Sequence, residues 1–179
     1  FNRWRSRRPV MFAAGCGLAI AVIGMASGGT TFGSGSESVK EMLAGEHDLP
    51  PLYGLLKFIA TWLTAWSGVP GGIFAPSLSV GAGVGHAVAG FAPSDLAPAL
   101  IAMGMAGFLA AVTQAPLTAF IIVMEMVDGH SMVLSLMASA MIASLVSRMI
   151  SRPLYETLAE HMVRAAISTS RPVEDAPQR

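Results

Sequence analysis

The chain has 179 residues, of which 53% are hydrophobic and 12% charged, and its formal net charge is zero. A soluble domain usually carries about 25% charged residues, so the composition indicates an all-α integral membrane protein with several spans. Cys16 is the only cysteine, which excludes an intrachain disulfide and a thiolate metal cluster. We expect no cofactor, no metal and no nucleic-acid partner.

The first part of the chain alternates apolar segments with glycine and proline. The basic residues 1–9 are interpreted as a cytoplasmic loop, and 10–26 is long enough for one span. Gly28-Gly29 ends this span, and the run Gly33-Ser34-Gly35-Ser36 follows it. This run lacks the GxxxxGK[ST] pattern of a phosphate loop, so we interpret it as a linker that leads to a short helix over 39–44.

A break in the middle of the chain is the most informative feature. Residues 52–66 are apolar apart from Lys57 and end at SGVPGGIFAP, residues 67–76. Proline and glycine this dense stop a helix, and the apolar run 74–91 starts a new one with Pro76 in its first turn. Amides at the start of a helix have no partner inside the helix. The pattern therefore fits either a packing corner or an anion site at a positive helix end.

The second part of the chain is predicted to form further helices with short breaks. Gly81 and Gly85 form a GxxxG pair that favours close helix packing, and a packing role for His86 is favoured over a proton relay. Pro93-Ser94-Asp95 has the signature of a helix N-cap. The predicted helices are 96–112, 117–127, 132–150 and 153–167, and the polar tail 168–179 is expected to be disordered and cytoplasmic.

Few titratable residues in these helices suggest a catalytic, ligand-binding or metal-binding role. Glu125 lies near the end of an apolar helix, where an interfacial role is favoured, and Asp128 and His130 are too isolated to indicate a metal site. Tyr155 is interpreted from its position alone as an aromatic-belt residue. Arginines before the first span and around the last predict that both ends are cytoplasmic.

Three stretches carry a resemblance to a known family: GGIFAP at 71–76, MAGFLAAVTQAPLTAFIIVMEM at 105–126 and RPLY at 152–155. They resemble the CLC family of chloride channels and proton-coupled chloride transporters. The resemblance covers about 10–167 and matches the C-terminal half of the family's membrane domain, one half of an inverted repeat with broken, re-entrant helices. Gln114 departs from the family, many of whose members carry a basic residue there, and this concerns local anion attraction rather than the fold.

The resemblance implies a chloride site made of backbone and phenol donors. The family's amide donors correspond to Ile73 and Phe74, beside Gly72, and its tyrosine donor corresponds to Tyr155. The family's gating glutamate and serine motifs, GxEGP and GSGxP, do not occur in the chain. The sequence therefore leaves open whether the protein is a channel or a proton-coupled exchanger.

The expected function is anion transport, with chloride as the first candidate, in a lipid bilayer such as a bacterial plasma membrane. A homodimer through 117–127 and 132–150 is also implied by the resemblance. The alternative is an unrelated broken-helix transporter for another anion. An organic-anion carrier would need a buried Arg or Lys, which 58–124 lacks. An enzyme is disfavoured because HExxH and GxSxG motifs do not occur.

Overall fold

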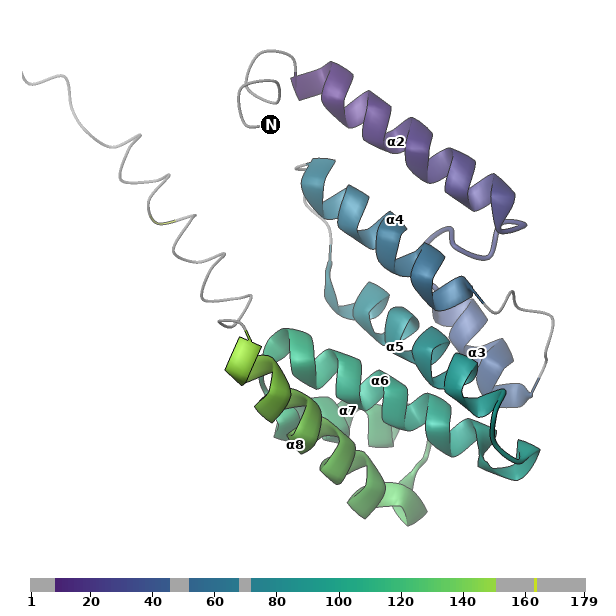
Figure 1. The fold of residues 1–179 in the computed structure, drawn as a ribbon, viewed down its shortest axis with the longest axis vertical. Coiled ribbons are helices and arrows are strands. Elements are labelled where there is room, and N and C mark those ends of the chain that lie inside the picture. The colour runs from purple at the N-terminus through teal and green to yellow at the C-terminus, as the bar shows by residue number, and fades with distance from the viewer. Residues whose placement is uncertain (1–8, 46–51, 68–71, 151–162, 164–179) are drawn as a thin grey trace, which may run out of the picture.

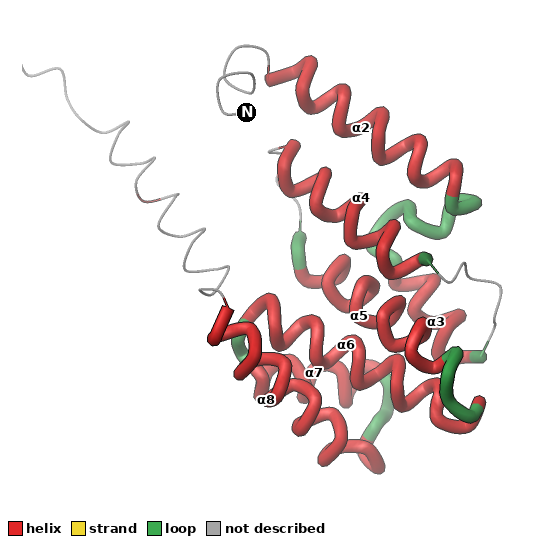
Figure 2. Tube along the Cα trace, in the orientation of Figure 1, coloured by secondary structure: helices red, strands yellow, loops and turns green. Residues whose placement is uncertain are grey.

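The computed structural model describes residues 9–45, 52–67, 72–150 and Val163, and every regular element in these ranges is a helix (Figures 1 and 2). The helices are α2 (Pro9–Ala26), α3 (Ser36–Ala44), α4 (Tyr53–Ser67), α5 (Phe74–Ala89), α6 (Ala97–Thr113), α7 (Pro116–Met126) and α8 (Val133–Ile150). Two short 3-10 turns, η1 (Ser94–Leu96) and η2 (His130–Met132), precede α6 and α8. The all-α prediction is confirmed. The predictions for 1–8, 153–162 and 164–179 lie outside the described residues.

Most predicted boundaries agree with the structure, and one local prediction is wrong. Ser94 and Asp95 do not cap a helix, because they form η1, and α6 begins only after Leu96 without a side-chain capping bond. The Leu96 amide bonds the Pro93 carbonyl at 3.0 Å. The chain thus enters α6 by tightening into a 3-10 turn, a common solution at helix ends.

Helix α6 is the centre of the described fold. It packs against α5 on one side and α8 on another, and α7 and α3 also contact it, whereas α4 and then α2 continue outward from α5 (Figure 1). Ile101, Met105 and Leu109 of α6 are almost completely buried. An apolar helix surrounded by helices in this way forms the core of a bundle.

The packing of α5 on α6 depends on glycine. A Cβ atom added at Gly81 would come within 2.6 Å of the Gly104 carbonyl oxygen, and one at Gly85 would meet the Leu100 carbonyl and Ile101 Cα. The GxxxG interpretation of Gly81 and Gly85 is therefore confirmed: only residues without a side chain let the two backbones approach this closely.

Two segments are long and apolar enough to cross a membrane, Ser94–Thr113 with 20 residues and His130–Ile150 with 21. Helix α7 has 11 residues, which corresponds to about 16 Å and cannot cross a hydrocarbon core of about 30 Å. It lies between two breaks, as the broken-helix prediction requires.

Candidate functional site: the start of helix α5

The site begins where the loop after α4 turns into α5. Ile73 adopts helical dihedral angles (φ −88°, ψ −20°) and caps the helix without a side-chain bond, so α5 begins at Phe74 as predicted. The Ile73 carbonyl accepts two bonds from Ser77, one from its amide at 3.0 Å and one from its hydroxyl at 2.7 Å. These bonds hold the first turn of the helix in place.

The first turn of α5 presents backbone donors and no side-chain donor of its own. In any α-helix the first N–H groups have no intrahelical acceptor and carry the positive end of the macrodipole. Pro76, the third residue of α5, has no N–H at all. The Ser77 hydroxyl donates to the Ile73 carbonyl. Donors for a ligand at this helix end are therefore the backbone amides before Pro76.

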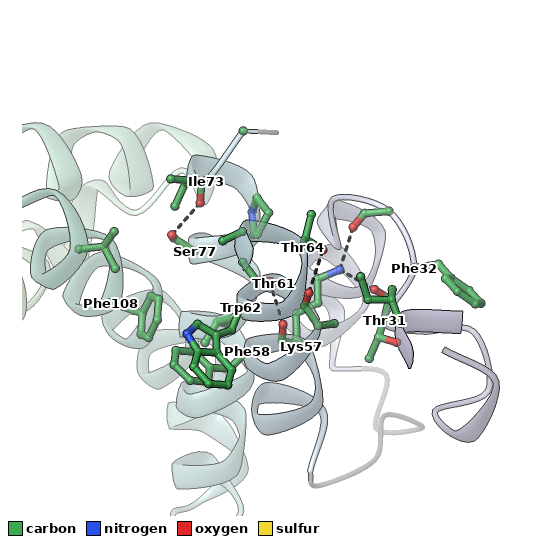
Figure 3. Close-up of a pocket in the computed structure, with 18 residues that line it drawn as sticks. Thr31, Phe32, Lys57, Phe58, Thr61, Trp62, Thr64, Ile73, Ser77 and Phe108 are labelled. Carbon is green, nitrogen blue, oxygen red and sulfur yellow. Dashed lines mark hydrogen bonds between the residues drawn. The ribbon is translucent and has the colours of Figure 1, made fainter. Parts of the chain in front are cut away.

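This helix end opens on a largely apolar cavity of about 530 Å³ (Figure 3). Gly72, Ile73, Pro76 and Ser77 contribute to its wall from the start of α5. Val80 lies further along α5, and the other lining residues come from α2, the loop after α2, α4 and α6, including Thr31, Lys57, Phe58, Thr61, Trp62 and Phe108. Amide donors beside an apolar wall can hold an ion without strong competition from water.

Lys57 lines the cavity as well, although it was not predicted from the sequence as a site residue. Its side chain is 2% exposed, and its ammonium donates to the carbonyls of Thr31 at 2.8 Å and Gly33 at 2.9 Å. Figure 3 shows the ammonium pointing toward the glycine-containing loop after α2. The signal was available, because Lys57 is the single charge in an otherwise apolar segment.

The position of Lys57 removes the reason given above for disfavouring an organic-anion carrier. An organic-anion carrier needs a buried Arg or Lys, and residues 58–124 contain neither. Lys57, however, lies one residue before that stretch and lines the cavity. A buried cation is therefore present at this site. Its two bonds to loop carbonyls also show that residues 31–33 are fastened to α4 and are more than a plain linker.

The two threonine hydroxyl groups that α4 contributes to the cavity wall are turned toward their own helix. Thr61 donates to the Lys57 carbonyl and Thr64 to the Ala60 carbonyl, each at 2.8 Å. Such bonds to the preceding turn satisfy the hydroxyl groups in an apolar setting. These threonines therefore contribute shape to the wall and no free hydroxyl donor.

The predicted site residues fall into three groups. Gly72 and Ile73 line the cavity together. Phe74 opens α5, but its side chain is 37% exposed and is not part of the cavity wall. Tyr155 lies outside the described residues. The role of the Phe74 amide as an anion donor therefore stays a prediction.

Transporters bind ions at the starts of broken helices near the middle of the membrane, and α5 offers such a helix start beside a pocket. Residues 1–148 match the family model described as voltage gated chloride channel, and the chain belongs to this family. The two apolar spans agree with membership in this family of membrane proteins.

The chain is also similar to two bacterial H(+)/Cl(-) exchange transporters named ClcA. It is 33% identical to the protein of Vibrio parahaemolyticus over 113 residues, which cover 59% of this chain and 24% of that protein. It is 39% identical to the protein of Klebsiella pneumoniae over 97 residues, which cover 47% and 20%. The matched region thus spans a fifth to a quarter of the length of these relatives.

Proposed function

We propose that this chain is the C-terminal half of a chloride-transporting membrane domain. In this proposal the backbone amides of Ile73 and Phe74, beside Gly72, hold the anion at the start of α5. The observation that carries the proposal is that α5 starts at Phe74 with Gly72 and Ile73 in the wall of an apolar cavity.

The physical argument for an anion follows from the donors available. The first turn supplies N–H groups and a positive dipole end, and both favour negative charge. Lys57 adds a cation to the same cavity wall, although two loop carbonyls already accept hydrogen bonds from its ammonium. A site of neutral donors binds an anion firmly enough to select it and weakly enough to release it.

Tyr155 is proposed as a further donor through its hydroxyl, on the strength of the RPLY match at 152–155. Both ends of the chain are proposed to be cytoplasmic, and the membrane to be a bacterial plasma membrane. The bacterial relatives are described as H(+)/Cl(-) exchange transporters, which makes coupled exchange the first mechanism to test beside passive conduction.

The test removes a single backbone donor from the full-length protein. Replacing Phe74 by its α-hydroxy analogue turns the Phe74 amide into an ester and deletes one N–H without changing the side chain. A hydrogen bond to a charged group is worth about 1.5–3 kcal/mol. We therefore expect chloride affinity, measured by isothermal titration, to fall about ten- to hundredfold.

Two controls separate the amide from other effects. Phe74→Ala removes the ring and keeps the N–H, and it should bind chloride nearly as well as the parent. An ester at Leu117, in the first turn of α7, deletes an equivalent helix-start donor away from the cavity and should leave affinity unchanged. Unaltered chloride binding by a folded Phe74 ester would refute the site.

A further inference from the structure

Arg148, near the end of α8, contacts the break between α6 and α7. Its guanidinium donates to the Gln114 carbonyl at 2.8 Å. Gln114 ends α6 in a left-handed conformation (φ 54°), with its amide bonded to the Ala110 carbonyl. Gln114 is 7% exposed, whereas the Arg148 side chain is exposed. A cation thus bonds to the carbonyl of the residue that ends α6.

The packing register places Arg148 at the same end of the bundle as the proposed anion site. Helices α5 and α6 run antiparallel, with Gly81 against Gly104 and Met105. Continuing this register by seven residues brings Phe74 beside residues 111 and 112. On the other side of α6, the Ser147 hydroxyl donates to the Ala111 carbonyl at 2.6 Å. The start of α5 and the end of α8 therefore flank the same turn of α6, as Figure 1 shows.

Charge is distributed unevenly along this part of the molecule. Between Leu52 and Ile150 the sequence contains two residues of the Lys/Arg type, Lys57 and Arg148. The carboxylates of the same stretch lie far from Arg148 along the helices: Asp95 is in η1 before α6, and Glu125 and Asp128 are at the end of α7. Within residues 52–150, the end of the bundle that holds the start of α5 thus carries Arg148 and no carboxylate.

We infer that Arg148 attracts anions to the start of α5 and so determines the apparent affinity of transport. This inference rests on the proposed function and deepens it. A guanidinium stays charged at every physiological pH, and a fixed charge beside a low-dielectric path raises the local concentration of its counter-ion. Arg148 thereby supplies a positive charge at the α6–α7 break, where the chain itself has the neutral Gln114.

A purely structural role for Arg148 makes a different prediction. Arginine near a helix C-terminus also satisfies carbonyls and complements the dipole. Arg148→Gln removes the charge and has a shorter side chain, whereas Arg148→Lys keeps the charge. A capping role depends on the hydrogen bond, and an attracting role depends on the charge.

The first experiment measures chloride efflux from liposomes that contain the full-length protein, over a range of chloride concentrations. At low ionic strength, Arg148→Gln should raise the half-saturating chloride concentration roughly two- to tenfold, and Arg148→Lys should stay within about twofold of the parent. The difference should shrink when an impermeant salt raises ionic strength and screens the charge.

The second experiment changes the charge after folding. Cys16 is replaced by alanine and Arg148 by cysteine in the full-length protein, which is then labelled with a cationic or an anionic methanethiosulfonate. The cationic label should lower the half-saturating concentration, and the anionic label should raise it. Equal responses to both labels, or Arg148→Gln with the affinity of the parent, would overturn the inference and leave the proposed function standing. A parent without saturable chloride efflux would instead reject the proposed function itself.

Discussion

Lys57 carries a charge into the interior of the bundle, and its surroundings explain why it is tolerated there. A buried ammonium is costly unless it is hydrogen-bonded. Here two carbonyls of the loop after α2 accept from it at 2.8 and 2.9 Å. The loop can offer its carbonyls because Gly28, Gly29 and Gly33 adopt positive φ angles that other residues rarely reach. The lysine and the glycines therefore depend on one another.

Lys57→Met should destabilise the full-length protein. Methionine keeps most of the apolar stem but removes the donor, which leaves the Thr31 and Gly33 carbonyls without this partner. An unsatisfied buried polar group costs about 1–3 kcal/mol, so the thermal midpoint in detergent should fall by several degrees. Lys40→Met, on the exposed side of α3, is the matched control and should change the free energy of unfolding by less than about 0.5 kcal/mol. Equal midpoints for the two variants would mean that Lys57 does not hold the loop.

Individual residues show where sequence reasoning stops. The start of α5 at Phe74 was predictable because proline and glycine act locally on backbone geometry. The partners of Lys57 and Arg148 were not predictable, since these cations bond to carbonyls 24 to 34 residues away in the chain. Backbone carbonyls occur at every residue and leave no mark in the sequence.

At the scale of whole helices, α7 and α8 present apolar side chains that the described fold does not cover. Leu117 and Ile121 of α7 are 61% and 47% exposed, and Met141 and Leu145 of α8 are 53% and 64% exposed. Val123 and Leu136 of the same two helices are fully buried. We propose that this exposed face forms the interface of a homodimer in the membrane, where close apolar packing drives association.

Cysteine cross-linking tests that interface. Single cysteines at 117, 121, 141 and 145 in the full-length protein without Cys16 should include positions that cross-link between subunits in the bilayer. Cysteines at the buried positions 123 and 136 should not cross-link, because they face the interior of their own subunit. A folded protein that forms no covalent dimer from any exposed position would contradict the proposed interface.

Helix positions were mostly predictable and helix contacts were not. Apolar runs bounded by glycine or proline predicted the positions of six helices within a few residues: α2, α4, α5, α6, α7 and α8. They did so because the bilayer requires a certain length and hydropathy of a membrane helix. The helix α3 begins three residues earlier than predicted, at Ser36 after the left-handed Gly35. The order of packing around α6 could not be read from runs that are apolar on all sides, since such helices carry no marked polar face.

At the scale of the whole molecule, the cavity beside the start of α5 is lined by residues of α2, the loop after α2, α4, α5 and α6. The matched region spans a fifth to a quarter of the length of its curated relatives. What the described residues contribute is the amide end of α5, the cavity beside it and the positive end of the bundle at Arg148. We propose that an anion binds at the amides of Ile73 and Phe74.

Anomalous diffraction from crystals of the full-length protein grown in bromide tests that claim most directly. Bromide replaces chloride and scatters anomalously, so it reveals the position of the anion independently of any mutation. The account predicts an anomalous peak within hydrogen-bonding distance of the Ile73 and Phe74 amide nitrogens at the start of α5. Bromide peaks elsewhere in the membrane domain, with none at these amides, would contradict it.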